Sequence, residues 1–299
     1  MMQRALNTYS LRNEWDKIAK KSLQHVADLC GDLAISRLEF FEAHFTPEKL
    51  QEDVAFFADH GIHVFSLAPH THLLAQEKEI PQMIEDGKYW LNMAAECGAE
   101  KIRVQVGDGP FTRIMMPMAD FDEEEWQEYN EQIEGAVEFT GRILDPLLET
   151  AEQTGTIIGI ETHHSYSSNY VYQERLSQRY QSPKLGWIFD IGNYENEDMR
   201  WKAVDVIKNR TTYWHAKSYA FDENGFETTL NYPKAGEIYK DAGFDGELSI
   251  EFEGKFNGIL GAFRTNELLK YIQAMADGTE YPMDTSLPSE KELMQRYSR

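Results

Sequence analysis

The chain is organised around one stretch, Thr156-Ile157-Ile158-Gly159-Ile160-Glu161-Thr162-His163-His164. Its first half is apolar and β-branched, which is typical of a strand in a parallel sheet that is covered on both faces. Its second half ends in a carboxylate and two imidazoles. An ionised Glu161 at the end of a buried strand is costly unless another group pairs with it. The stretch therefore predicts a buried strand whose last residue needs a partner.

The same pattern recurs along the chain: an amphipathic helix, a glycine and then a short apolar strand. Glycine accepts the left-handed conformation that ends many helices. The glycines at these junctions are Gly31, Gly61, Gly98, Gly155 and Gly243. The expected strands are 4–11, 34–40, 62–67, 101–106, 156–161, 185–190, 212–217 and 247–251. The expected helices are 14–30, 47–60, 76–97, 123–154, 168–181, 196–209, 233–242 and 259–276.

Strict alternation of strands and helices predicts the fold class. It favours an α/β protein with a single-domain (β/α)8 TIM barrel over an open doubly wound sheet. No Gly-x-Gly-x-x-Gly follows the first strand, which argues against a dinucleotide-binding fold. We assign residues 1–277 to the barrel and 278–299 to a polar C-terminal tail. Within the tail, Ser289-Glu290-Lys291-Glu292 has capping-box spacing and predicts a short helix, an arm against the barrel or a neighbouring subunit.

Composition excludes several classes of protein. A hydrophobic content of 41% and an aromatic content of 12% predict a packed globule. No apolar run approaches the roughly 18 residues of a membrane span, and the N-terminus lacks the apolar region of a signal peptide. We therefore expect a cytoplasmic protein without a membrane partner. Cys30 and Cys97 are expected as buried thiols rather than as a disulfide or metal ligands.

The net charge of −22 argues against a nucleic-acid partner, because a basic stripe for phosphates is missing. Part of this charge lies in the acidic run 120–125. Negative charge suits the start of a helix, so we interpret the run as a solvated helix start rather than a site.

The strand ends carry the chemistry. Glu161 ends the fifth strand, Asp190 ends the sixth, His215 lies in the seventh and Glu251 in the eighth. The carboxyl ends of barrel strands meet at one mouth, where three carboxylates would repel one another without a cation. Each residue alone is weak evidence, since Asp190 could shape a turn and His215 could be a core histidine. Together they predict one divalent metal ion, with Mn²⁺ first and Zn²⁺, Co²⁺ or Mg²⁺ as alternatives.

These four residues, in this order, resemble the xylose isomerase-like TIM barrels, and within them the sugar phosphate isomerase/epimerase group. That group includes ketose 3-epimerases, hydroxypyruvate isomerase, inosose dehydratase and, more distantly, endonuclease IV. The resemblance covers about residues 4–277. It implies that Glu161, Asp190, His215 and Glu251 are the metal ligands, and that Glu161 and Glu251 also exchange substrate protons.

Two departures from the family lie on the sixth and seventh strands. Asn193 stands where many relatives have a histidine, and an amide cannot shuttle a proton. His215-Ala216-Lys217-Ser218 stands where relatives often have His-x-Lys-Asp.

The chemistry of the residues agrees with the resemblance. A metal that chelates a carbonyl and its neighbouring hydroxyl stabilises an enediolate, and two carboxylates can serve as base and acid. We therefore predict a metal-dependent isomerase or epimerase of a small sugar or polyol ketone, with Glu161 and Glu251 as catalytic residues. Whether the substrate is phosphorylated and whether the protein is a homo-oligomer stay open.

Other polar residues near the strand ends are expected to bind substrate. They are His70, His164, Lys217, Asn193, Gln105 and Glu39. His72 and His163 rank below them, and Arg103 is interpreted as a structural ion-pair partner.

Three alternative functions remain. An inosose-dehydratase-like lyase would expel a β-hydroxyl as water from the same enediolate. A DNA repair enzyme of the endonuclease IV type is disfavoured by the acidic charge and because Asn193 and Gln105 replace expected histidines. A non-catalytic barrel would bind a metal or ligand for regulation.

Overall fold

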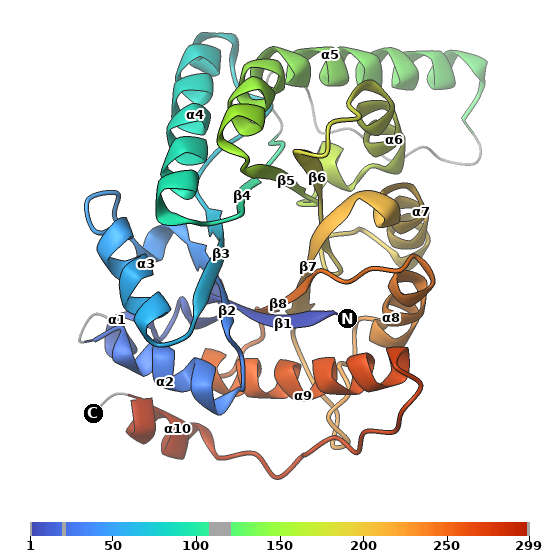
Figure 1. The fold of residues 1–299 in the computed structure, drawn as a ribbon. Coiled ribbons are helices and arrows are strands. Elements are labelled where there is room, and N and C mark those ends of the chain that lie inside the picture. Colours follow the sequence, from blue (N-terminus) through green and yellow to red (C-terminus); the bar gives the residue numbers. More distant parts are fainter. Residues whose placement is uncertain (1, 20–21, 108–120, 298–299) are drawn as a thin grey trace. The chain divides into compact units, whose positions relative to one another are not determined.

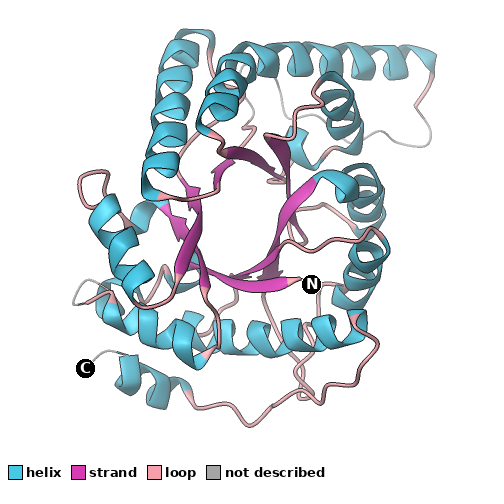
Figure 2. Ribbon diagram, in the orientation of Figure 1, coloured by secondary structure: helices cyan, strands magenta, loops and turns pink. Residues whose placement is uncertain are grey.

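The structure is a computed structural model that describes residues 2–19, 22–107 and 121–297. In this part of the chain, eight parallel strands close into a barrel in the order of the sequence (Figure 2). Their bounds are β1 (Gln3–Asn7), β2 (Arg37–Phe41), β3 (His63–Ala68), β4 (Lys101–Val104), β5 (Ile157–Glu161), β6 (Leu185–Asp190), β7 (Thr211–Ser218) and β8 (Glu247–Phe252). The prediction of a (β/α)8 barrel is confirmed.

Helices connect the strands, because neighbouring parallel strands need a crossover. The α-helices are α1 (Trp15–Ile18), α2 (Gln24–Asp32), α3 (Leu50–Asp59), α4 (Ile80–Cys97), α5 (Glu123–Thr154), α6 (Tyr170–Arg179), α7 (Glu197–Ile207), α8 (Tyr232–Asp241), α9 (Gly258–Ala276) and α10 (Glu290–Tyr297). The 3-10 turns are η1 (Thr8–Leu11), η2 (Glu42–His44), η3 (Glu77–Glu79), η4 (Ser165–Ser168) and η5 (Lys208–Arg210). None of the described helices combines the length and the apolar character needed to span a membrane.

Two predicted elements near the N-terminus differ from the structure. The first strand ends at Asn7, because the Asn7 side chain accepts a hydrogen bond from the Tyr9 N–H and starts the turn η1. The single helix expected over 14–30 is instead α1 and α2, and residues 20–21 between them lie outside the described part.

The acidic run is a helix start as predicted. Asp122 caps α5 by accepting from the Glu124 and Glu125 N–H groups, and the Glu125 side chain returns the bond. Asp120 of the run lies outside the described residues.

Four of the five predicted glycine stops are confirmed by their backbone. Gly61, Gly98, Gly155 and Gly243 have φ values of 72, 77, 80 and 69°. The prediction for Gly31 is wrong: α2 continues past it to Asp32, and Ala34 (φ 52°) takes the left-handed conformation there.

Contacts divide the chain into two compact units. Unit 1 comprises Met1–Leu67 and Tyr213–Arg299, and it brings together strands from the two ends of the sequence. Strand β1 pairs with β2 on one side and β8 on the other, with Leu6 opposite Leu38 and Ile250. These three side chains are fully buried, so they form part of the core of unit 1.

The C-terminal helix α10 packs on unit 1, beside α2 (Figure 1). Ser289 caps its start: the Ser289 N–H donates to the Glu292 carboxylate and the Ser289 hydroxyl accepts from the Glu292 N–H, so the predicted capping box is confirmed. Leu293 and Tyr297 are each 1% exposed, and the Tyr297 hydroxyl donates to Asp32 on α2. The tail therefore contains an arm that covers the barrel's outer helices. The domain boundary at residue 277 stays a prediction.

Unit 2, Ala68–Thr212, holds the strands that lead to Glu161 and Asp190. Strand β5 pairs with β4 and β6, as the apolar stretch Ile157–Glu161 predicts for a central parallel strand. Helices α4 and α5 lie side by side on this unit (Figure 1). They approach closely because Gly87 has no Cβ, which would lie 2.6 Å from Cδ2 of Leu147.

Both cysteines are free thiols, as predicted. Burial raises the pKa of Cys30 to about 12, which keeps this thiol protonated and unreactive. The prediction of a buried thiol is wrong for Cys97, which is half-buried because it is the last residue of α4.

Candidate metal centre

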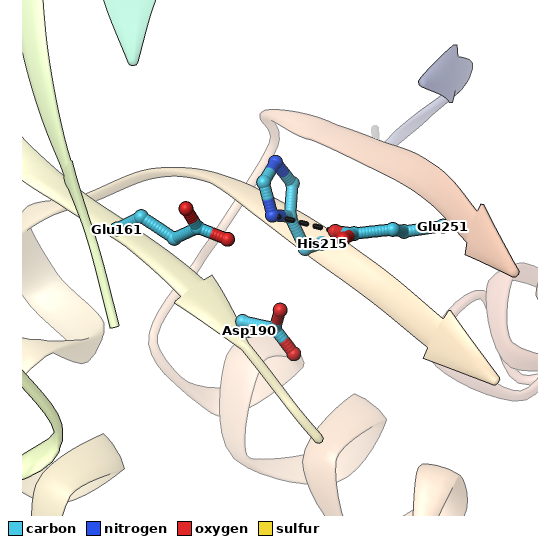
Figure 3. Close-up of side chains that lie close together, drawn as sticks. All are labelled: Glu161, Asp190, His215 and Glu251. Atoms are coloured by element: carbon cyan, nitrogen blue, oxygen red, sulfur yellow. Dashed lines mark ion pairs between the residues drawn. The ribbon is translucent and has the colours of Figure 1, made fainter. Parts of the chain in front are cut away.

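His215 and Glu251 lie on the adjacent strands β7 and β8 of unit 1. The pairing register sets Lys217 opposite Glu251 and His215 opposite Ser249. Nδ1 of His215 is 2.8 Å from Oε2 of Glu251, the contact drawn as a dashed line in Figure 3. The two residues are 1% and 5% exposed. An imidazole and a carboxylate are thus held together in the interior.

The other ring nitrogen of His215 faces Glu39, the middle residue of β2. Nε2 is 3.0 Å from both Oε1 and Oε2 of Glu39. Carboxylates lie against both ring nitrogens, but Nε2 is the one with hydrogen-bond geometry to both oxygens of a single carboxylate. When Nδ1 gives its lone pair to a cation, the single proton of the neutral imidazole lies on Nε2. The lone pair of Nδ1 then points to the Glu251 side of the ring, where a cation could accept it.

Two hydroxyl groups complete the surroundings of Glu39. The Tyr213 hydroxyl donates to Oε1 at 2.8 Å, and the Ser249 hydroxyl donates to Oε2 at 2.8 Å. Burial and then the charge of Glu39 raise the pKa of Tyr213 well above its ordinary value, so the phenol stays a donor. Tyr213 and Ser249 were not among the predicted site residues. Their sequence signal is that each lies two residues before a proposed ligand, Tyr213 before His215 and Ser249 before Glu251, and shares its strand face.

Lys217 lies two residues beyond His215 and is 2% exposed. Its Nζ is 3.6 Å from Oε1 of Glu251 and 3.6 Å from Oε2 of Glu253. A buried ammonium between two carboxylates offsets their mutual repulsion. Contact of Lys217 with a substrate stays a prediction.

Glu161 ends β5 in unit 2 and is 1% exposed. Nη1 of Arg103 is 3.0 Å from its Oε2, which confirms Arg103 as an ion-pair partner. Nε2 of Gln105 lies 3.4 Å from the same oxygen. Both partners come from β4 or its continuation, next to β5, and they fix the direction of the Glu161 side chain.

Asp190 ends β6 and is fully buried. The Gly192 N–H donates to its Oδ1 at 2.8 Å, and Nδ2 of Asn193 donates to its Oδ2 at 2.6 Å. Asp190 therefore shapes the turn after the strand, the alternative role that its sequence context suggested. Asn193, 2% exposed, holds the carboxylate in a fixed orientation.

The four predicted ligands form one candidate metal site. Each of Glu161, Asp190, His215 and Glu251 offers one ligand atom, and these atoms lie within 4.8 Å of one another (Figure 3). Three carboxylate oxygens and one imidazole nitrogen suit Mn²⁺, Co²⁺ or Zn²⁺. Ligands of protein-bound metals are commonly oriented by such outer hydrogen bonds as those from Glu39, Arg103 and Asn193. The donor set and its surroundings fit a divalent cation.

The remaining predicted substrate contacts lie on loops of unit 2. His70 is exposed, and its ring centroid is 4.6 Å from that of His72. His164 is exposed as well and has a positive φ of 56° at the start of η4, as has its neighbour Ser165 (46°). Backbone strain of this kind is frequent at functional sites. A substrate contact at His70 or His164 stays a prediction.

A family model described as "Xylose isomerase-like TIM barrel" matches residues 25–274. No curated protein matches the sequence.

Solved structures share the fold at low sequence identity. A sugar phosphate isomerase/epimerase from Parabacteroides distasonis is 15% identical, with a TM-score of 0.64, covering 90% of this chain and 93% of its own. An L-ribulose 3-epimerase is 13% identical, with a TM-score of 0.67 and coverage of 93% and 96%. The IOLI protein, solved with a zinc atom, is 15% identical, with a TM-score of 0.65 and coverage of 94% and 100%.

Proposed function

This chain belongs to the xylose isomerase-like TIM barrel family, and we propose that it is a metal-dependent isomerase or epimerase of a small sugar or a related polyol ketone. The observation that carries the proposal is the group Glu161, Asp190, His215 and Glu251, whose ligand atoms lie within 4.8 Å of one another. A buried group with three carboxylates is unfavourable by itself, and a divalent cation compensates their charge. Mn²⁺ is the cation that we would test first.

The four residues would hold the cation, and its chemical contribution is to polarise the substrate carbonyl as a Lewis acid. The chain's own residues would have to supply a base that takes the proton from the carbon next to the carbonyl and an acid that returns one.

Glu161 and Glu251 are the proposed base and acid. The contacts of Arg103 and Gln105 fix the position of Glu161, and those of His215 and Lys217 fix the position of Glu251. Fixed carboxylates transfer protons efficiently because little reorganisation is needed. Return of the proton to the opposite face of the same carbon gives an epimer, and return to the adjacent carbon gives an aldose–ketose isomer.

The proton path does not use residue 193, where an amide replaces the histidine found in many relatives. Asn193 donates its Nδ2 hydrogen to Asp190, and an amide does not titrate. For recognition of substrate oxygens we propose Lys217 and Gln105, with His70 and His164 from the loops of unit 2. A lysine cation and neutral donors suit hydroxyl, carbonyl or phosphate oxygens.

Proton NMR in D₂O tests the proposal. The protein is incubated with Mn²⁺ and a panel of ketoses, ketose phosphates and inososes. Incorporation of deuterium at a carbon next to the carbonyl is the expected result, and it identifies the substrate and the site of proton transfer together. A product lighter by one water would assign the lyase reaction instead. Metal binding without exchange in any substrate would favour a non-catalytic barrel.

Glu161→Gln and Glu251→Gln test the assignment of base and acid. Each is expected to lower deuterium exchange by about 10²–10⁴-fold. Glu247→Gln is the matched control, because Glu247 is a buried carboxylate on the same strand as Glu251 but pairs with Arg37 at 2.6 Å. Full exchange in both Glu161→Gln and Glu251→Gln would show the assignment to be wrong.

A further inference from the structure

A fully buried carboxylate lies behind the candidate metal centre. Glu39 on β2 is 0% exposed, and four contacts of 3.0 Å or shorter reach its two oxygens. We propose that Glu39 is a positioning residue: it holds His215 in the tautomer that offers Nδ1 to a cation, and it does not bind substrate. The part of this inference that concerns the cation rests on the proposed function.

The two ring nitrogens of His215 face two different carboxylates. Its Nε2 lies 3.0 Å from both oxygens of Glu39, while its Nδ1 lies 2.8 Å from Oε2 of Glu251, one of the four proposed ligands. A neutral imidazole carries one proton, and the ring nitrogen that donates to an outer carboxylate leaves the other nitrogen free to bind a metal. Glu39 therefore selects Nδ1 as the ligand atom.

Two hydroxyl groups hold the Glu39 carboxylate in place. Oε1 accepts from Tyr213 and Oε2 accepts from Ser249, both at 2.8 Å. The Tyr213 hydroxyl also lies 3.1 Å from the Ser66 hydroxyl on β3. This network, Glu39, Ser66, Tyr213, His215 and Ser249, joins four strands of unit 1, and its members are at most 1% exposed.

The same geometry argues against a substrate contact. Tyr213, His215 and Ser249 already surround both oxygens of Glu39. A sugar hydroxyl that reached either oxygen would have to displace one of these donors, which would then be buried without its partner. Both oxygens of the carboxylate are instead hydrogen-bonded to side chains of the protein, which they orient.

Glu39→Gln tests the inference, since it keeps the size of the side chain and removes its charge. The first measurement is NMR of the metal-free protein with ¹⁵N-labelled histidine, in which Nε2 of wild-type His215 is expected to be protonated in the neutral ring and in the imidazolium alike. The amide can turn either its oxygen or its NH₂ group to the ring, so the variant is expected to lose this preference. The control is Glu247→Gln, another buried carboxylate of unit 1, which is expected to keep the wild-type tautomer.

The second measurement is the Mn²⁺ affinity, by competition titration. Loss of an outer partner of a metal ligand typically weakens binding by about 10–100-fold, and we expect this loss for Glu39→Gln and none for Glu247→Gln. If Glu39→Gln does not fold, Tyr213→Phe and Ser249→Ala serve instead. Each removes one donor to Glu39 and is expected to weaken Mn²⁺ binding in the same direction by a smaller factor.

Wild-type tautomer and wild-type Mn²⁺ affinity in these variants would overturn the inference. So would an increase in KM at unchanged Mn²⁺ affinity, because it would assign Glu39 to the substrate. If the wild-type protein bound no divalent cation, the proposed function would fail, whereas the tautomer measured in the metal-free protein would still decide the role of Glu39.

Discussion

Nη1 of Arg103 lies 3.0 Å from Oε2 of Glu161, and both side chains are buried. The two residues are on the paired strands β4 and β5, where Arg103 stands opposite Gly159 and reaches along the barrel to the strand end. The proposed base thus has a cationic partner within unit 2 itself. That partner stabilises the Glu161 carboxylate and orients it at the same time.

We predict that Arg103→Met destabilises the metal-free protein. Breaking a buried ion pair typically lowers the free energy of unfolding by about 3–5 kcal/mol, because an uncompensated charge is left inside. Urea unfolding with a chelator measures the loss, and saturating Mn²⁺ is expected to restore part of it. Arg142→Met is the control: Arg142 pairs with Glu77 at the surface, with side chains 47% and 68% exposed, and loss of such a pair costs about 0–1 kcal/mol. Equal losses in the two variants would contradict the prediction.

Asn193→Ala is predicted to weaken metal binding without unfolding the protein. It removes the 2.6 Å hydrogen bond that orients Asp190, and a loss of about 10–100-fold in Mn²⁺ affinity is expected. Isothermal titration calorimetry measures it. Asn196→Ala provides the comparison, because Asn196 caps α7 by accepting from the Met199 N–H, and its loss costs about 1 kcal/mol of stability. A Mn²⁺ affinity that is the same in both variants would refute the role of Asn193.

His44 is predicted to make the protein sensitive to acid. Burial lowers the pKa of His44 to about 3, from an ordinary value of 6.5, and the attraction of Asp16 opposes this only in part. The ring stacks on Trp15 with centroids 3.8 Å apart, and Nδ1 is buried without a hydrogen-bond partner among the described residues. The neutral imidazole therefore fits the folded state and the imidazolium does not.

The sign of this effect follows from proton binding. Between about pH 6.5 and 3 the unfolded chain binds a proton at His44 that the folded protein does not. The stabilisation is complete above pH 6.5 and is lost as the pH falls, by about 1.4 kcal/mol per pH unit. His44→Phe is expected to remove this contribution, so that between pH 6.5 and 5 it loses about 2 kcal/mol less unfolding free energy than the wild type. Parallel pH profiles for the two proteins would exclude His44 as the cause.

Leu293→Ala is predicted to destabilise the fold from the C-terminal arm. Leu293 on α10 is 1% exposed, and removal of a buried leucine side chain costs about 2–5 kcal/mol. Denaturant unfolding measures the change. Gln295→Ala, on the exposed face of the same helix, is expected to stay within about 0.5 kcal/mol of wild type. If the two variants were equally stable, the packing of α10 would make no measurable contribution to the free energy of unfolding.

The sequence by itself determined the alternation of strands and helices, because hydrophobic periodicity, glycine stops and caps are properties of neighbouring residues. Helix α5 has the bounds that were predicted, and the Ser289 capping box starts α10 as expected. Glu161, Asp190, His215 and Glu251 could be proposed as well, since the first two end their strands and the other two lie in the carboxyl-terminal half of theirs. Local patterns did not predict two boundaries. The first strand ends early because the Asn7 side chain caps a turn, and α2 continues past Gly31 to Asp32.

Only the tertiary structure decided which groups surround these residues. Tyr213 and Ser249 donate to Glu39 across 174 and 210 residues of sequence, and Arg103 meets Glu161 across 58. Such pairs depend on strand register, since a slip of one residue turns every side chain to the other face. The hydrophobic pattern of a strand indicates which face is buried, but it does not say which residue of the neighbouring strand stands opposite. The sequence predicted Glu39 as a substrate contact, whereas in the structure its two oxygens accept from Tyr213, Ser249 and the imidazole of His215.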